Sequence, residues 1–144
     1  MSPLHSAADV ACWLQNSLDC DTVEPTSDIL ADVGVAGDDF HELMEKYAEA
    51  FSVDMSGYLW YFHTDEEGGG LDIGGSILQP PYERVKRIPV TPAMLADFAN
   101  KGAWDLDYPP HRVPKWRYDI LINNILVGAL SLWLGYKLIK ALLH

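Results

Sequence analysis

A run of uncharged residues near the carboxyl end constrains this chain more than any other feature. Residues 120–136 read ILINNILVGALSLWLGY, and the helix that they predict carries apolar side chains all round. A surface helix of a soluble domain shows one apolar stripe and one polar face. Up to Leu143 only Lys137 and Lys140 interrupt the segment, and about 20 residues suffice to cross a membrane. The sequence therefore predicts a transmembrane helix within residues 118–144; the alternative is a buried core helix.

The charges that flank this segment predict its orientation. Arg112, Lys115 and Arg117 precede it, whereas Lys137 and Lys140 lie at its far end. The larger basic cluster is expected on the cytoplasmic side, in contact with anionic headgroups at the membrane surface. The first nine residues contain no Lys or Arg, so we expect no signal peptide. Together these features predict a single-pass tail anchor in the inner membrane, with the N-terminal domain in the cytoplasm.

Net charge separates the tail from the rest of the chain. Residues 1–111 carry five Lys and Arg against twenty Asp and Glu, a formal net charge of −15, whereas residues 112–144 carry five against one, or +4. This excess of carboxylates excludes a generic nucleic-acid binder, because phosphate recognition needs clustered Lys and Arg. Two cysteines are too few for a disulfide scaffold. Residues 108–117, with three prolines and three basic side chains, predict an extended juxtamembrane linker.

One face of the predicted span is built of small and polar residues. Its members recur at helical spacing, and they are Asn124, Gly128, Ser131 and Gly135. Small residues let two helices approach closely in lipid, and an asparagine can hydrogen-bond across the contact. Gly and Ser are common in membrane helices, so a chance arrangement is the alternative. We expect this seam to contact a membrane protein or a second copy of the chain.

The rest of the sequence predicts a small all-helical domain. The periodicity of its apolar residues and its capping signals indicate helices over residues 7–18, 37–51 and 92–101, and a short helix or turn near residues 57–63. Ser6 and Thr91 are the expected N-caps of the first and last helices, and Gly37 or Asp38 that of the second. Residues 64–90 are acidic, then rich in Gly, then rich in Pro, and predict an irregular insertion.

Several motifs resemble those of a known family. They are DILADVG at residues 28–34, then Asp39, Glu42, Leu43 and Phe51, and later PVTPAML at residues 89–95 and GAW at residues 102–104. The first group resembles an acyl carrier protein. With the second, the chain is similar to a carrier-protein-like family of uncharacterised bacterial proteins, catalogued as a domain of unknown function. The resemblance implies a small acyl-carrier-like helical bundle over residues 1–107, to which this chain adds a membrane helix.

The residue at the attachment position of an acyl carrier protein differs here. The resemblance places Gly37 where those proteins have the serine that bears phosphopantetheine, and glycine has no hydroxyl to modify. We therefore expect no cofactor, and the scattered histidines indicate neither a metal site nor a catalytic residue. His63 is expected in a solvated acidic loop.

Without the attachment serine, the resemblance still implies one part of carrier function, the surface that recognises partner proteins. In that family the acidic second helix docks on Arg and Lys of partner enzymes. Here the corresponding face carries five carboxylates, at Asp38, Asp39, Glu42, Glu45 and Glu49. A merely solvated helix face is the alternative.

These expectations lead to one functional hypothesis and two alternatives. The hypothesis is a non-enzymatic, membrane-anchored adaptor or regulatory protein with a degenerate carrier-like domain. Its expected partners are a basic protein surface, a membrane protein or second copy of the chain, and the lipid bilayer. The alternatives are an acyl carrier with an atypical attachment site that serves a membrane-bound acyltransferase, and a small subunit of a membrane protein complex.

Overall fold

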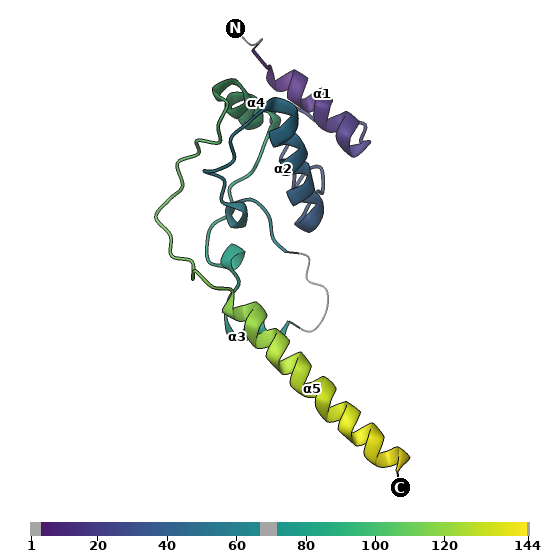
Figure 1. The fold of residues 1–144 in the computed structure, drawn as a ribbon. Helices are drawn as coiled ribbons and strands as arrows, with labels where there is room; N and C mark the ends of the chain where they lie inside the picture. Colours follow the sequence, from purple (N-terminus) through teal and green to yellow (C-terminus); the bar gives the residue numbers. More distant parts are fainter. Residues whose placement is uncertain (1–3, 67–71, 144) are drawn as a thin grey trace. The chain divides into compact units, whose positions relative to one another are not determined.

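The computed structural model describes residues 4–66 and 72–143 (Figure 1). Within these ranges the chain forms five α-helices and two short 3-10 helices. The same ranges contain no β-strand, and the one pairing of extended backbone is an isolated parallel bridge between Asp54 and Ala103. The predicted all-helical class is therefore confirmed.

The chain divides into two compact units. Met1–Glu67 and Val85–Pro110 form the first, which we call the acidic unit, and Gly68–Arg84 and His111–His144 form the second, which we call the tail unit. The sequence prediction assigns all of residues 64–90 to the N-terminal domain. In the structure, part of that segment groups with the tail instead.

Local capping signals set the first and last helices of the acidic unit. Helix α1 (Ala7–Leu18) begins with a capping box. The Asp9 N–H donates to the Ser6 hydroxyl at 3.1 Å, and the Ser6 N–H donates to the Asp9 carboxylate at 2.8 Å. Helix α4 (Pro92–Lys101) begins with the Met94 N–H donating to the Thr91 hydroxyl at 3.3 Å. Both predicted N-caps are confirmed, because each side chain satisfies a donor that the helix leaves unpaired.

The start of helix α2 (Gly37–Phe51) differs from the prediction. Its N-cap is Ala36, which makes no side-chain capping hydrogen bond, so the expected cap at Gly37 or Asp38 is wrong. Gly37 is instead the first residue of the helix. Ala36 has no hydroxyl or carboxylate with which to cap the helix. The start of α2 is held instead by a hydrogen bond from Gly37, described below.

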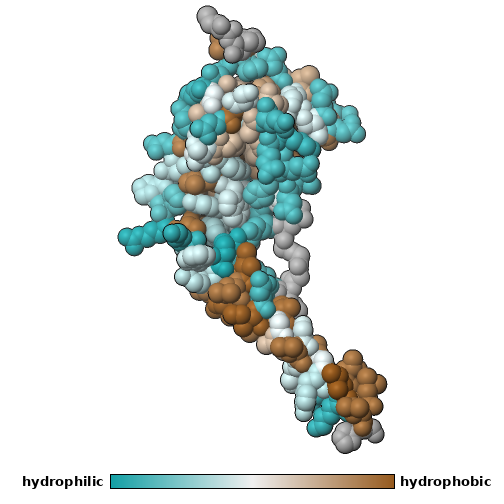
Figure 2. Space-filling model, in the orientation of Figure 1, coloured by the Kyte–Doolittle hydropathy of each residue, from teal (hydrophilic) through white to brown (hydrophobic). Residues whose placement is uncertain are grey.

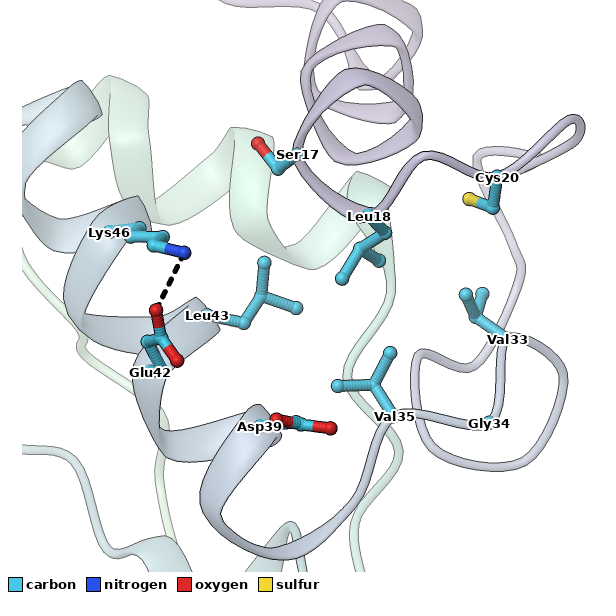
Figure 3. Close-up of a pocket in the computed structure, with 10 residues that line it drawn as sticks. All are labelled: Ser17, Leu18, Cys20, Val33, Gly34, Val35, Asp39, Glu42, Leu43 and Lys46. Atoms are coloured by element: carbon cyan, nitrogen blue, oxygen red, sulfur yellow. Dashed lines mark ion pairs between the residues drawn. The ribbon is translucent and has the colours of Figure 1, made fainter.

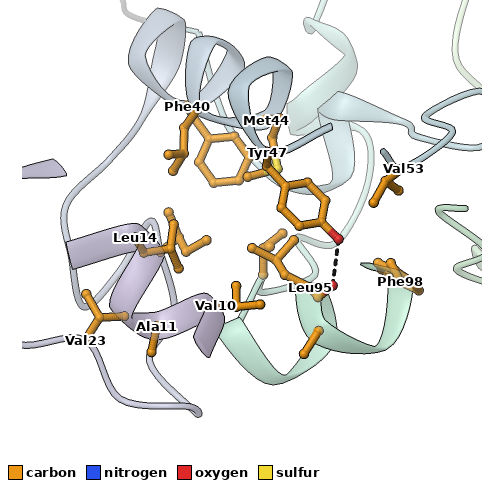
Figure 4. Close-up of a cluster of buried hydrophobic side chains, with 14 of the residues drawn as sticks. Val10, Ala11, Leu14, Val23, Phe40, Met44, Tyr47, Val53, Leu95 and Phe98 are labelled. Carbon is orange, nitrogen blue, oxygen red and sulfur yellow. Dashed lines mark hydrogen bonds between the residues drawn. The ribbon is translucent and has the colours of Figure 1, made fainter. Parts of the chain in front are cut away.

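The core of the acidic unit lies between α1, α2 and α4 (Figure 4). Its fully buried side chains include Leu14 of α1, Phe40 and Tyr47 of α2, and Leu95 of α4. The Tyr47 hydroxyl donates to the Leu95 carbonyl oxygen at 2.6 Å, which satisfies the one polar atom of that side chain. Complete burial of a side chain of this size contributes about 1.5–3 kcal/mol, so these contacts dominate the stability of the unit.

An ion pair links the segment that precedes α4 to the loop between α1 and α2. The Arg87 guanidinium donates to both oxygens of Asp28, at 3.2 and 2.6 Å. Beside it, the Ile29 N–H donates to the Val90 carbonyl oxygen at 3.0 Å. Burial alone would raise the pKa of Asp28, but the bonds from Arg87 and from the Leu30 N–H hold that pKa below its ordinary value.

The tail unit contains the long helix α5 (Tyr118–Leu142) and two short elements, α3 (Ile73–Ile77) and the 3-10 helix η2 (Pro81–Glu83). Both short elements lie in the segment predicted to be irregular. Among the described residues, α5 is the one helix long and apolar enough to cross a membrane, and none of its most apolar stretch is buried. Figure 2 shows apolar side chains exposed along it. The lack of burial of this stretch among the described residues favours the membrane span over the buried core helix.

Candidate docking face and membrane helix

The predicted acidic face lies along the exposed side of α2. All five carboxylate residues are exposed, whereas the opposite side of the helix buries Phe40, Leu43, Met44 and Tyr47 in the core. The two sets separate because apolar residues recur every three or four positions along the helix. The carboxylates are therefore available to water or to a partner, and the domain does not need them for packing.

A groove of about 350 Å³ runs beside the first half of α2 (Figure 3). Its apolar walls come from three elements: the end of α1, the loop before α2, and α2 itself. They are formed by Leu18, Val33, Val35 and Leu43, and Ser17, Cys20 and Gly34 complete the lining. The polar border belongs to α2 and consists of Asp39, Glu42 and Lys46. The structure thus brings two of the five predicted carboxylates to a groove with both polar and apolar lining, and Asp38, Glu45 and Glu49 do not line it.

Lys46 is a border residue that the sequence analysis did not single out. Its ammonium group lies 2.8 Å from the Glu42 carboxylate, one helical turn away. That hydrogen bond lowers the pKa of Glu42. Both side chains are exposed, so the pair contributes little to stability and opens readily. A cation from another molecule can therefore replace Lys46 at Glu42 at small cost.

The shape and charge of the groove suit a side chain that has an apolar stem and a positively charged end. Apolar walls bind an aliphatic or aromatic stem, and the adjacent carboxylates bind a positive end group. Arg and Lys side chains combine both properties. Within the described residues no three His, Cys, Asp or Glu side chains form a group that could hold a metal.

Gly37 occupies a buried and conformationally restricted position. Its φ is +56°, in the left-handed region that favours glycine, and its N–H donates to the buried Thr64 hydroxyl at 3.1 Å. A side chain here would be strained by about 1–2 kcal/mol. The residue that the resemblance aligns with the attachment serine is therefore held inside the acidic unit. A serine at this position would carry the strain of the left-handed conformation.

A buried histidine directly precedes Thr64, the hydrogen-bond partner of Gly37. His63 and Thr64 are both buried, so the expected solvated loop is wrong at its first two residues. Its Nδ1 lies 2.9 Å from the Ile88 carbonyl oxygen and its Nε2 lies 2.8 Å from the Tyr108 hydroxyl. These partners define a neutral ring, with the proton on Nδ1 and Nε2 accepting from Tyr108. Burial, with a smaller effect of the Arg87 charge, lowers the pKa of His63 to about 4.

The partners of His63 explain why the sequence did not reveal its burial. Tyr108 also accepts hydrogen bonds from the Trp104 indole N–H at 2.9 Å and from the Leu59 N–H at 3.1 Å. Residues from three distant parts of the chain thus satisfy the polar atoms of His63 and Tyr108. No local pattern around His63 signals this network, whose role is structural.

The predicted seam lies on α5 without any cover from the described chain. A Cβ built at Gly128 or at Gly135 would meet no described atom within 4 Å. Asn124 and Ser131 are exposed, and the Ser131 hydroxyl donates to the Val127 carbonyl oxygen at 2.8 Å. That bond inside the helix uses the serine donor. Asn124 is therefore the member of the seam with a side chain best able to bond a partner.

The three predicted membrane-surface cations have different environments. Arg112 and Lys115 are exposed. Arg117 is the N-cap residue of α5, and its guanidinium lies 2.6 Å from the buried carboxylate of Asp119. This ion pair offsets the charge of Arg117, so Arg112 and Lys115 are the better candidates for contact with headgroups.

Comparison with known proteins gives one match. Residues 8–107 match the family described as "Protein of unknown function (DUF1493)". The chain belongs to this family. The matched segment of this DUF1493 protein runs from the first turn of α1 to the residue before Tyr108, so α5 lies outside it. No curated protein and no solved structure matches the chain.

Proposed function

We propose that this DUF1493 protein is a non-enzymatic adaptor or regulatory protein, anchored in the inner membrane by α5 with its acidic unit in the cytoplasm. The acidic unit is a degenerate acyl-carrier-like domain that has kept a recognition face and lost the attachment site. One observation carries the proposal: Asp39 and Glu42 border a groove beside α2 that also has apolar side chains in its walls. The partner it fits is a protein surface that presents Arg or Lys beside apolar side chains.

The charge of the chain supports this choice of partner. The groove lies in a part of the sequence with a formal net charge of −15 over residues 1–111. Such a field attracts a basic surface from a distance and accelerates encounter, most strongly at low salt. The apolar walls of the groove then contribute the contact that persists when salt screens the charges.

The dimensions of α5 support attachment to a membrane. Its 25 residues, at about 1.5 Å each, exceed the roughly 30 Å of a hydrocarbon core. Arg112 and Lys115 precede the helix in an exposed linker, and the positive-inside rule supports a cytoplasmic position for the acidic unit. An adaptor held there would meet partners that are themselves bound to the membrane.

Charge reversal on α2 tests the proposal with a matched control. The first variant carries Asp39→Lys and Glu42→Lys, which border the groove, and the second carries Glu45→Lys and Glu49→Lys, which do not. Both variants change the net charge equally and leave the buried face of α2 intact. The full chain, tagged and solubilised from membranes in detergent, captures partners at low and moderate salt, and mass spectrometry identifies them.

We expect the groove variant to lose the captured partner and its salt dependence, and the control variant to retain most of it. Equal loss in both variants would indicate a general effect of charge and not a site. Unchanged capture in both would mean that the carboxylates are merely solvated, and the adaptor proposal in this form would fail.

The small-subunit alternative has an observation of its own in the open seam on α5. Gly128→Leu and Gly135→Leu would fill the seam and prevent close approach of a second helix. Loss of a membrane partner from these variants, with capture by the groove unchanged, would favour the small-subunit function. The acyl-carrier alternative has no such support at Gly37. A single phosphopantetheine adduct, seen by intact mass after expression with a transferase, would revive it.

A further inference from the structure

Helix α3 packs against the first turns of α5 through a glycine. Gly74 is buried, and a Cβ built there would overlap the Asp119 carbonyl oxygen and lie 2.9 Å from the Asn123 backbone nitrogen. Both of these atoms belong to backbone that cannot swing aside. Only glycine permits so close an approach of two helices. The contact is therefore a specific docking of residues 73–77 onto α5 (Figure 1).

The docked helix exposes two large apolar side chains. Ile73 is 41% exposed and Ile77 is 61% exposed, and they lie one turn apart on one face of α3. Trp116, 68% exposed, and Tyr118 stand exposed at the start of α5. Figure 2 shows apolar side chains gathered over this part of the tail unit. Water is a poor environment for such a cluster on a helix of only five residues.

The position of α3 along α5 corresponds to the membrane interface. Asp119 and Arg117 form an ion pair, and charged groups avoid the hydrocarbon core, so the first turn of α5 lies at or above its boundary. Lys137 and Lys140 lie near the opposite end of the helix, where they can reach the other interface. Because Gly74 docks at Asp119 and Asn123, α3 sits at the depth of the headgroups and upper acyl chains. Exposed Trp and Tyr side chains are typical of the same depth.

We infer that α3 is a second membrane-contacting element, whose Ile73 and Ile77 insert into the bilayer interface beside the first turns of α5. The inference rests on the proposed membrane attachment through α5. The occupant is lipid because the exposed face of α3 continues the apolar surface of α5, and no described segment covers either of them. The contact fixes the rotation of α5 and the depth of its first turn.

Depth-dependent quenching of a fluorophore tests this inference on the full chain. In a background of Cys12→Ser and Cys20→Ala, single cysteines at Ile77 and at Leu130 each receive an environment-sensitive dye. Leu130 is exposed near the middle of α5 and reports on the span. A cysteine at the exposed Asp97 of α4 is the control in the acidic unit. The protein is reconstituted in vesicles of phosphatidylethanolamine and phosphatidylglycerol with quenchers near the headgroup or near the chain ends.

The expected result is that the shallow quencher reduces the fluorescence of the dye at position 77. The deep quencher should reduce the fluorescence of the dye at position 130. Quenching at Leu130 without quenching at Ile77 would overturn the inference and leave the anchor standing. No quenching at Leu130 would overturn the anchor and the inference with it. If the dye at position 77 is protected from the lipid quencher only at high protein density, the exposed face of α3 binds a second copy of the chain. That result would overturn the inference.

A second variant tests the docking itself. Gly74→Leu forces α3 away from α5, so it should abolish quenching at Ile77 and leave quenching at Leu130 unchanged. Persistence of Ile77 quenching in this variant would show that its depth does not depend on the contact with α5, and this part of the inference would fail.

Discussion

The acidic unit and the tail unit are both helical, but their apolar side chains face different surroundings. In the acidic unit Leu14 and Phe40 are fully buried among other side chains of the same unit. In α5, Leu132 is 78% exposed, and the one buried residue of the helix is the charged Asp119. Helical periodicity identifies the helices of the acidic unit, whereas the length of the uncharged apolar run identifies α5. The distribution of apolar residues around that helix indicates whether protein or lipid is its solvent.

The first prediction tests the comparison by removing the apolar helix. Deletion of residues 118–144 should move the protein completely from the membrane fraction to the soluble fraction, because the described part of the remaining chain contains no other helix that can span the bilayer. Fractionation of cells with alkaline extraction measures the change. A full-length protein that stays soluble and monomeric would show that α5 is not a membrane span.

The second prediction compares the same substitution in the two units. Leu14→Ala in α1 should lower the free energy of unfolding of the acidic unit by about 2–5 kcal/mol, because it removes buried contacts and leaves a cavity. Leu132→Ala in α5 should leave this free energy unchanged within about 0.5 kcal/mol. Chemical denaturation in detergent, followed by near-ultraviolet circular dichroism, measures both. Similar losses in the two variants would mean that α5 contributes to the core of the acidic unit.

The third prediction concerns acid. His63 is neutral when folded, with a pKa of about 4, whereas the unfolded chain protonates it near its ordinary value of 6.5. As the pH falls from 6.5 to 4 the unfolded state gains protons and the folded state does not. The free energy of unfolding should therefore decrease with falling pH over this window, by about 3 kcal/mol in total. Because the pKa of Asp28 is lowered from 3.8, its own acid loss begins only near the bottom of this window and continues below it.

His63→Asn is the control for this acid sensitivity. The variant will be less stable at neutral pH because it loses buried hydrogen bonds, so the slope with pH is the quantity to compare. Urea midpoints at several pH values give that slope. An unchanged slope in His63→Asn would assign the acid sensitivity to other groups.

The smallest effect is expected on the surface of α2. Glu45→Lys with Glu49→Lys should change the free energy of unfolding by less than about 0.5 kcal/mol, because both carboxylates are exposed. Relief of repulsion within an acidic unit can raise stability slightly. Thermal melts at low and high salt measure the change, and a loss above 1 kcal/mol would show that these residues serve the fold and not a partner.

Local sequence determined the four longer helices and the caps of two of them. The capping box of Ser6 and Asp9, the Thr91 cap and the uniformly apolar composition of residues 120–136 each predict an element that the structure contains. The exposed carboxylates of α2 follow equally from periodicity. These features were predictable because a helix cap and a helix face depend on residues within about one turn of each other.

Tertiary structure alone decided the groove, the buried positions and the role of α3. The groove on α2 needs walls from α1 and from the loop before α2, and the neutral His63 needs Ile88 and Tyr108. Gly74 lies in a segment that the sequence predicts to be irregular. The need for glycine there follows only from its contact with the backbone of Asp119, which is distant in the sequence. Such contacts carry no local signature, because burial and close approach are properties of the whole packed chain, whereas periodicity and capping are properties of neighbouring residues.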